Sequence, residues 1–467
     1  MPASDIEVFI TRCISHVLAA DNLTIAIQRA RALGELIWRN NIPQYQLKDL
    51  EDALLARCKS GFKAPQKPEH LHQYLHVLTR AYASGGHTRV VEHLLASKAL
   101  PDACVLVTEK APQNTLVKLS TQDKACVLLP EFKNKHDKIQ HLLALFCQYQ
   151  TLILHVHPYD IESVLAAGLA RHFFGTKIYF YNHADHVFSY GHGMADIVLE
   201  LSYFGWELSK IRGTHHKCVF AGIPLKLPDT IIDRPDNANG HIASAGTAYK
   251  YKPGGGYSFP DFARSLLAKT DRSLMLIGPN LLTNWWWWLP ALKMGRRAVF
   301  HKRMAYQDYL ACMKQASVYV DSFPLTGGTA FPEMAIKGLP SFGILSGAHG
   351  YSPADQLKSS STTALLADLE TYLQQQIRPG INHAAIMQQI RDVHAVENVA
   401  IRISRAESAD EQEKQVPWPN PAPINCDFYE KIWAKGKLFM PPIHNAPDWK
   451  LSVLFLRYWL QSRKLSN

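Results

Sequence analysis

The segment from Ala316 to Leu345 constrains the possible fold of this chain more than any other segment of the sequence. Its ends, 316–320 and 341–345, are apolar runs that predict buried strands, with a glycine turn and a short helical pattern between them. This order predicts a βαβ unit with parallel strands. The turn at Gly327–Thr329 sets backbone N–H groups at a helix start, which favours a phosphate, and Glu333 lies about one turn later, within reach of ribose hydroxyls. An ordinary crossover with a flexible turn fits the same residues, so both interpretations stay open on this segment alone.

Apolar runs alternate with helical patterns along most of the chain. The predicted strands are 74–79, 105–108, 125–129, 151–156 and 177–181 in a first region, and 241–245, 274–277, 298–300, 318–320 and 341–345 in a second. Strands that alternate with helices favour mostly parallel sheets, whose ligands bind beyond the carboxyl ends of the strands. The sequence therefore predicts the α/β class, with its polar strand-end loops gathered at the ligand site.

Four segments are predicted along the chain. Residues 1–66 carry apolar residues at helical spacing and form a helical N-terminal extension. Residues 67–235 form the first α/β domain and residues 236–415 the second, with a linker around Asp229 to Asn239. Residues 416–467 begin with a proline-rich connector and end in helical patterns.

Composition narrows the class of protein. The net charge is +10, which suits a phosphorylated donor, an anionic acceptor, a membrane surface or nucleic acid, but no nucleic-acid-binding motif is present, so nucleic acid is not an expected partner. The eight cysteines are scattered without a C-x-x-C pair, which predicts neither a zinc site nor disulfides and favours a cytoplasmic protein. No secretory signal and no apolar run of about 18 residues is found, so no membrane span is predicted.

The segment from Asp321 to Pro340 resembles the donor site of GT-B glycosyltransferases and is similar in spacing to that of the O-linked N-acetylglucosamine transferase family. The positions that carry the resemblance are Asp321, Gly327, Thr329, Glu333, Gly338 and Pro340. The resemblance implies two Rossmann-like domains, a phosphate loop and an acidic residue on the ribose. Gly328 stands where that family often has His, Ala330 where it has a second Thr, and Leu325 where retaining GT-B enzymes have a Glu. The subfamily and the stereochemical outcome therefore stay open.

A second glycine loop follows the first predicted strand. Ser84-Gly85-Gly86-His87-Thr88-Arg89 opens a helix, and its paired glycines permit a tight turn with close backbone approach. The loop resembles the Gly-Gly-His-Thr loop of a group of bacterial GT-B transferases. His87 is then a candidate general base or a donor to the sugar or phosphate, with Gly85, Gly86, Thr88 and Arg89 on the acceptor side. Capping of the helix by His87 and Thr88 is the structural alternative.

Histidines and aspartates end two further strands of the first region. His155, His157 and Asp160 end one of them, and His183, Asp185 and His186 end the next. An Asp bonded to a His orients the imidazole and raises its basicity, so Asp185 or His186 is the second candidate for the base. His157, Asp160 and His183 are expected on the acceptor side. A His-x-His pair without a clear third ligand is weak evidence for a metal, and none is predicted. Structural hydrogen bonding at the strand ends is the alternative.

A lysine-containing loop follows the first strand of the second region. Gly246 begins it, and Lys250 and Lys252 lie where they could neutralise a pyrophosphate. Tyr249-Lys250 with Pro253 resembles a segment of the N-acetylglucosamine transferase family whose lysine contacts the diphosphate, which implies that role for Lys250 and makes Lys252 the second candidate. Two surface lysines are the alternative. Arg303 lies where GT-B enzymes often contact the base, and we expect a donor contact there by position alone.

Two apolar segments are not explained by the predicted donor and acceptor sites. Trp285 to Trp288 cannot all face a core in helix or strand geometry, so at least one should be exposed at a sugar, partner or membrane surface. The segment 450–464 mixes apolar residues with four cations, which suits either a packed helix or a helix at a membrane surface.

Together the motifs predict a hexosyl- or N-acetylhexosaminyl-transferase. It would move a sugar from a nucleotide-sugar donor, with UDP as the expected nucleotide, to a glycan, lipid-linked or protein acceptor in cell-surface polysaccharide synthesis. No cofactor is expected beyond the donor, and a peripheral contact at the inner membrane face stays open. The alternatives are a nucleotide-sugar epimerase or hydrolase of the same fold, and a non-catalytic scaffold module.

Overall fold

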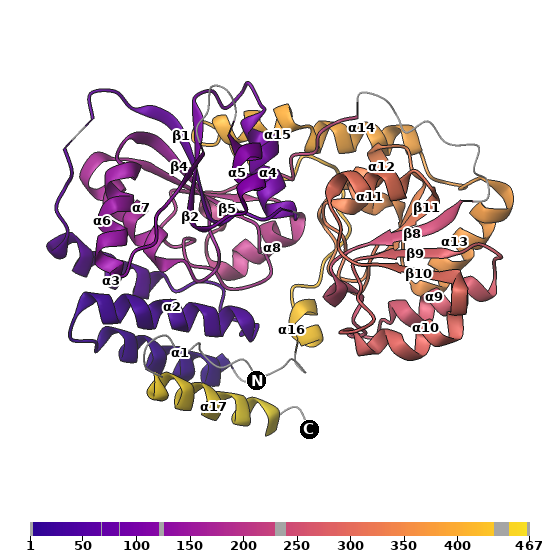
Figure 1. The fold of residues 1–467 in the computed structure, drawn as a ribbon, viewed down its shortest axis with the longest axis horizontal. Coiled ribbons are helices and arrows are strands. Elements are labelled where there is room, and N and C mark those ends of the chain that lie inside the picture. The colour runs from indigo at the N-terminus through magenta and orange to yellow at the C-terminus, as the bar shows by residue number, and fades with distance from the viewer. Residues whose placement is uncertain are drawn as a thin grey trace.

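The computed structural model describes residues 3–66, 68–83, 85–120, 126–228, 240–433 and 448–464. Two parallel sheets, each flanked by helices, lie side by side along the length of the molecule (Figure 1). The predicted α/β class is confirmed. The linker expected at 229–239, and Ser84 of the first glycine loop, lie outside the described residues.

The first sheet has the strand order β3-β2-β1-β4-β5-β6-β7. Its strands are β1 His72–Arg80, β2 Ala103–Lys110, β3 Cys126–Leu128, β4 Tyr149–His155, β5 Lys177–Asn182, β6 Ile197–Glu200 and β7 Cys218–Phe220. Its helices are α4 Gly86–Leu95, α5 Gln113–Leu119, α6 Lys135–Phe146, α7 Ile161–Phe174 and α8 Tyr203–Arg212. The central strands β1 and β4 are buried on both faces, as their unbroken apolar runs predict.

The second sheet repeats this arrangement with the order β10-β9-β8-β11-β12-β13. Its strands are β8 His241–Ala245, β9 Leu274–Ile277, β10 Ala298–His301, β11 Ala316–Val320, β12 Ser341–Ile344 and β13 Lys358–Ser359. Its α-helices are α9 Phe259–Ala268, α10 Trp288–Met294, α11 Tyr306–Met313, α12 Ala330–Ile336, α13 Thr362–Gln375 and α14 His383–His394. Short 3-10 turns cover Ala248–Tyr251, Trp285–Trp287 and Pro353–Leu357. The predicted βαβ unit is β11-α12-β12, with β11 and β12 paired in parallel.

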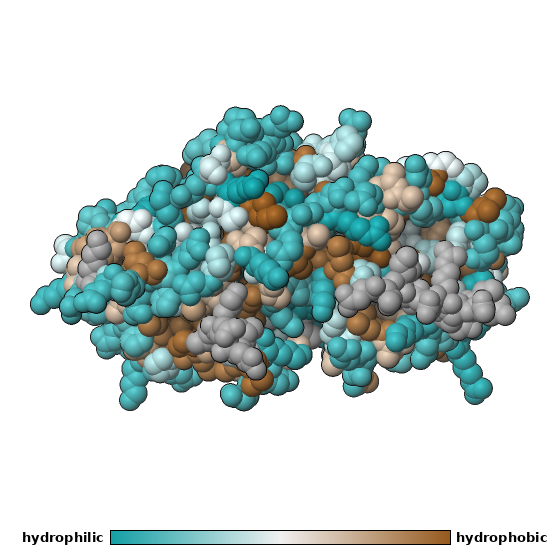
Figure 2. All heavy atoms as spheres, turned by 90° about the horizontal axis from the view of Figure 1, so that it is seen from above, coloured by the Kyte–Doolittle hydropathy of each residue, from teal (hydrophilic) through white to brown (hydrophobic). Residues whose placement is uncertain are grey.

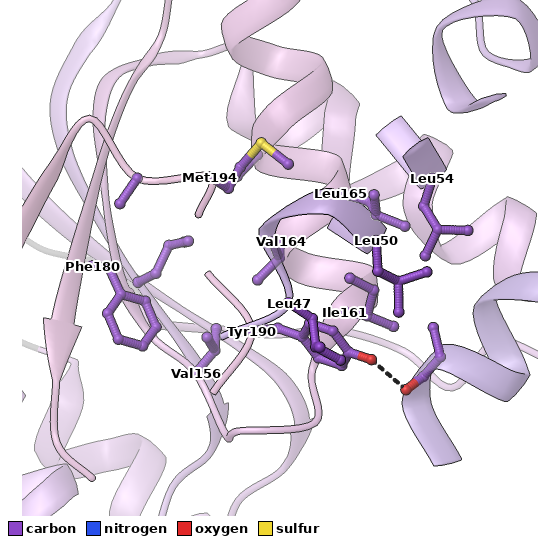
Figure 3. Packing of buried hydrophobic residues seen from close by; sticks show 14 of the residues in the cluster. Leu47, Leu50, Leu54, Val156, Ile161, Val164, Leu165, Phe180, Tyr190 and Met194 are labelled. Atoms are coloured by element: carbon purple, nitrogen blue, oxygen red, sulfur yellow. Dashed lines mark hydrogen bonds between the residues drawn. The ribbon is translucent and has the colours of Figure 1, made fainter. Parts of the chain in front are cut away.

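Three helices precede the first sheet and share its core. They are α1 Ala3–Leu18, α2 Leu23–Arg39 and α3 Lys48–Gly61. Leu50 and Leu54 of α3 pack with Ile161 and Leu165 of α7, and the Tyr190 hydroxyl donates to the carbonyl of Ala30 at 2.7 Å (Figure 3). The extension is therefore part of the first unit's hydrophobic core and not a separate body.

Ion pairs and one buried carboxyl group fix the same junction. Arg31 of α2 forms ion pairs with Glu109 at 2.5 Å and Glu162 at 2.6 Å, and Lys135 contacts Glu162 at 2.8 Å. Glu51 of α3 is fully buried and accepts from the backbone N–H groups at 191 and 194, at 3.0 and 3.1 Å. These bonds hold the extension in one position on the first unit.

The chain after α14 returns to the first unit. Helix α15, Val396–Ser404, packs against α4, and α16, Phe428–Trp433, lies between the two sheets (Figure 1). Helix α17, Trp449–Lys464, packs against α1, where the Phe9 ring stacks on Tyr458 with centroids 4.5 Å apart. Among the described residues, no helix is both long and apolar enough to cross a membrane.

Candidate functional site

Each sheet has a switch point in its strand order, next to its central strand. In both sheets the first strand in sequence lies beside the fourth, and the order runs outward from that pair in opposite directions. Ligands of doubly wound sheets bind at such a switch point, beyond the carboxyl ends of the strands. The loops after β1, β4, β8 and β11 lie at these points, and they contain most of the predicted site residues.

The glycine loops of the two units touch each other. A Cβ atom on Gly86 would lie 3.3 Å from Thr329 Oγ1, and one on Gly85 would lie 3.2 Å from the Arg303 guanidinium. Gly85 also has φ +141°, which L side chains rarely adopt. The acceptor-side loop therefore meets the predicted phosphate loop because it carries no side chains there.

Arg89 and Glu333 join the two units directly. The guanidinium of Arg89 lies 3.2 Å from the Glu333 carboxylate and 3.8 Å above the centre of the Tyr306 ring. The Tyr306 hydroxyl also donates a short hydrogen bond to Glu333. The carboxylate predicted to bind ribose is thus held by a residue of the first unit and one of the second.

Lys250 reaches the phosphate loop from the turn after β8. Its ammonium donates to the carbonyl of Thr326 at 2.6 Å, directly before Gly327. Burial lowers the pKa of Lys250 from its ordinary value, and the nearby Asp321 carboxylate opposes this shift. Lys252 is exposed, and a Cβ on Gly246 would lie 3.2 Å from Ser322 Oγ. Of the two lysines, Lys250 has the position from which a diphosphate could be contacted.

A buried ion triad beneath the phosphate loop was not predicted. Asp321 accepts from the backbone N–H of Gly327 at 2.8 Å, and the Lys358 ammonium lies 3.0 Å from Asp321 and 2.9 Å from Asp355. Lys358 lies on a strand of two residues with no motif around it, so no local pattern indicates this role. The triad fixes the start of the loop.

Asp185 and His186 form the dyad that their adjacency predicts. His186 Nδ1 lies 2.9 Å from Asp185 Oδ1, and Asp185 is buried. The Tyr351 hydroxyl of the second unit donates to Asp185 at 3.2 Å, and Ser202 Oγ donates a short bond. The His186 ring stacks on Tyr429 of α16, with centroids 4.1 Å apart. The dyad is thereby held from both units and from the returning chain.

Tyr351 also explains the glycine at position 328. A Cβ on Gly328 would lie 2.9 Å from the Tyr351 ring. A side chain at this position would push that ring away, and the ring's hydroxyl bonds Asp185. The predicted phosphate loop and the dyad are thus linked through one aromatic side chain.

The remaining histidines form a chain of ring contacts. His76 Nδ1 lies 2.9 Å from His155 Nε2, and His155 Nδ1 lies 2.7 Å from His183 Nε2. His87 packs edge-on against His183 and donates through Nε2 to the carbonyl of His155 at 2.8 Å. Burial lowers the pKa of His87 to about 4 and holds the pKa values of His155 and His183 well below their ordinary value. The imidazoles of His87, His155 and His183 are therefore neutral at pH 7.

Three predicted acceptor-side residues are engaged in local structure. Asp160 is buried, caps α7 by accepting from Ser163 N at 3.1 Å, and accepts from Thr79 Oγ1 at 2.6 Å. Thr88 Oγ1 accepts from Tyr82 N at 2.8 Å. His157 Nε2 lies 2.9 Å from the Tyr82 hydroxyl. These hydrogen bonds form the structural network at the strand ends that was the alternative to an acceptor-side role.

Within the described ranges, no group of three or more His, Cys, Asp or Glu residues could hold a metal ion.

The buried histidines predict an acid-sensitive fold. Burial lowers the pKa of His157 and of His394 to about 3, beside the shifts of His87, His155 and His183. The unfolded chain binds protons first as pH falls below about 6.5, so the free energy of unfolding should drop by about 1.4 kcal/mol per pH unit for each such histidine. Urea unfolding at about pH 7 and pH 5 measures the loss.

A matched pair of variants identifies the cause of this loss. His394→Gln should reduce the slope of stability against pH, because His394 is buried on α14, outside the candidate site. His216→Gln should not, because His216 is exposed. A wild-type stability that stays constant between these pH values would contradict the prediction.

Similarity to known proteins is found in the comparison of structures and not in the comparisons of sequence. No family model matches the chain, and no curated protein matches it in sequence. Similar solved structures include HepE of Anabaena with UDP and glucose bound, at 11% identity and TM-score 0.55, covering 72% of this chain and 100% of that one. Another is the apo lipopolysaccharide outer core galactosyltransferase WaaB, at 14% identity and TM-score 0.50, covering 72% and 99%. A variant of the Thermobaculum terrenum O-GlcNAc transferase covers 86% of this chain and 75% of its own, at 13% identity and TM-score 0.50. The resemblance to the GT-B fold is confirmed.

Proposed function

We propose that this protein is a glycosyltransferase that moves a hexosyl or N-acetylhexosaminyl group from a UDP-linked donor to a glycan or lipid-linked acceptor in the cytoplasm. The observation that carries the proposal is the contact between the two units beyond β1 and β11, where Arg89 of α4 lies 3.2 Å from Glu333 of α12. A transferase of this fold needs donor and acceptor groups to converge at such a junction. That HepE is described with UDP and with UDP-glucose supports the choice of nucleotide.

The second unit supplies the donor site. Lys250 and the loop from Gly327 to Thr329 would hold the diphosphate, and Glu333 would accept from the ribose hydroxyls once Arg89 and Tyr306 release it. Negative charge grows on the diphosphate as the bond from the anomeric carbon to its oxygen breaks. A cation already fixed at this position stabilises that charge without further reorganisation. Arg303 and the exposed Lys252 are the further donor-side candidates.

The first unit supplies the base, and the Asp185–His186 dyad suits this role best. The acceptor hydroxyl oxygen would attack the anomeric carbon, its proton would pass to His186 Nε2, and the nucleoside diphosphate would leave with the bonding electrons. Asp185 holds the other imidazole nitrogen as a donor and stabilises the imidazolium that forms. His87 suits the role less, because its Nε2 already donates to a carbonyl and burial lowers its pKa to about 4. A retaining reaction would need no such base, and the dyad would then position the acceptor.

A thermal-unfolding panel tests the proposal. UDP and UDP-sugars are expected to raise the Tm of the full chain, because a ligand that binds only the native state stabilises it by mass action. GDP, CMP and TDP with their sugars are the comparison set and should shift it less. Absence of a shift with every nucleotide would overturn the donor site and favour a scaffold module.

Product analysis then separates the enzymatic alternatives. A transferase releases UDP quickly only when an acceptor is present, whereas a hydrolase or an epimerase converts the donor alone. Incubation of UDP-sugars with and without a mixture of glycan and lipid-linked acceptors distinguishes these outcomes. Full conversion without acceptor would contradict the transferase.

A further inference from the structure

Helix α17 has two apolar faces, and only one of them is packed. Leu451, Phe455 and Tyr458 face α1 and are buried. A second stripe, Trp449, Val453, Leu456 and Leu460, follows the helix at spacings of four, three and four residues and is between 39% and 70% exposed. We call these four residues the outer stripe. Packing against α1 explains the inner face and leaves the outer stripe without a structural role.

A second exposed apolar surface lies on the other unit. It consists of Leu282, Trp285, Trp288, Leu289 and Leu292, which are between 58% and 81% exposed, and we call it the tryptophan surface. Trp287, within the same run, is fully buried and anchors the segment in the second core. The predicted exposure of at least one tryptophan is therefore confirmed for two of the four. Side chains of this size at such exposure on one short segment indicate a contact surface and not isolated residues.

Exposed cations lie on the two segments that form these surfaces. Lys293 and Arg296 are exposed beside the tryptophan surface, and Lys450 and Arg457 are exposed beside the outer stripe. The sequences 281–297 and 449–464 contain neither Asp nor Glu. Asp448, directly before α17, is turned inward and pairs with His16 at 2.7 Å and Arg29 at 3.3 Å. Apolar side chains with tryptophan and exposed cations match the chemistry of an anionic lipid surface.

The helices that carry most of the two surfaces lie along one edge of the molecule (Figure 1). Helices α10 and α17 both run along the lower edge in Figure 1, one below each sheet. The opposite edge, seen in Figure 2, is covered mainly by hydrophilic residues with apolar groups between them. One flat surface placed below the molecule would meet α10 and α17 together.

We propose that the outer stripe and the tryptophan surface together dock this protein on an anionic bilayer. The tryptophan and leucine side chains enter the headgroup region, and the four exposed cations contact lipid phosphates. A second copy of the chain fits less well, because a symmetric contact would bring two surfaces of the same positive charge together. The inference rests on exposure and charge and does not depend on the proposed transfer reaction.

Co-sedimentation of the full chain with vesicles tests the proposal. The protein should pellet with vesicles of phosphatidylcholine mixed with phosphatidylglycerol and much less with phosphatidylcholine alone. Added salt should weaken the binding, because the cations contribute to it. Since the two surfaces act as linked contacts, Leu456→Asp or Leu289→Asp should each lower the apparent vesicle affinity by about 100-fold.

Two control variants carry the same change elsewhere. Val117→Asp on α5 and Ile377→Asp after α13 replace exposed apolar residues away from both surfaces and should bind vesicles like the wild type. Circular dichroism and Tm check that all four variants are folded. Absence of wild-type binding, or equal loss in test and control variants, would overturn the proposal. The proposal would also fail if the wild type formed oligomers instead of binding vesicles and the two test variants abolished this self-association. That result would assign these surfaces to a contact with a second copy of the chain.

Discussion

Replacing Lys250 with methionine is expected to lower kcat/KM for sugar transfer by about 100- to 1000-fold. The Lys250 ammonium lies at the entry to the glycine loop, bonded to the carbonyl of Thr326 at 2.6 Å. Methionine preserves most of the side-chain length and removes the charge that would stabilise the departing diphosphate. The fold should persist, because burial already disfavours the charged lysine, as its lowered pKa indicates. Initial rates over a range of donor concentrations, with Tm recorded alongside, measure the effect.

The matched control removes a lysine charge from the same unit. Lys269 is exposed and pairs with Glu370 at 2.6 Å, so Lys269→Met should leave the rate unchanged. The Lys250 variant should also lose the stabilisation by UDP that the wild type shows. If it kept both the rate and the UDP shift, the diphosphate would have to bind elsewhere.

Replacing Asp185 with asparagine is expected to lower kcat by about 100- to 10,000-fold for an inverting reaction. The carboxylate accepts from His186, Tyr351 and Ser202, and an amide cannot accept from all three without turning its NH2 group toward one of them. The imidazole of His186 would then lose the partner that fixes its tautomer and stabilises its charged form. Single-turnover rates measure the step itself, and a UDP thermal shift shows whether the donor still binds.

A second carboxylate of the first unit provides the control. Asp196 accepts from Ile178 N at 2.8 Å and pairs with Arg171 at 3.2 Å, and it lies before β6 at the opposite end of that strand from Glu200. Asp196→Asn should lower stability by about 1 kcal/mol and leave kcat unchanged. A kcat that survives in Asp185→Asn would remove the dyad from the chemistry.

Apolar runs in the sequence predicted most strands of the two sheets, and three short strands were missed. Strands β8 and β9 begin and end where the sequence placed them. Strands β6, β7 and β13, of four, three and two residues, were not predicted. Each is held by its pairing with a longer neighbour, which is information from the tertiary structure.

Local sequence patterns predicted the candidate site residues, but they did not predict the contacts between residues far apart in the chain. Glycine loops at strand ends and the adjacent Asp185–His186 pair are local patterns, so their residues could be proposed as candidates. The contacts of Arg89 with Glu333 and of Tyr351 with Asp185 join residues far apart in the chain, and no local pattern indicates them. Asp160 shows the converse, since a strand-end aspartate can serve a ligand or cap the next helix, and here it caps α7.

The packing of α17 against α1 also affects how the chain is made. The apolar face of α1, with Phe9 at its centre, is covered by Phe455 and Tyr458, which lie near the other end of the sequence. At a synthesis rate of about 5–20 residues per second, α1 would wait about 20 to 90 seconds for α17 to leave the ribosome. During that time both α/β units can fold while this face remains open to chaperones. A nascent chain that stalls before α17 would keep the face exposed and present it to the proteases that remove incomplete proteins.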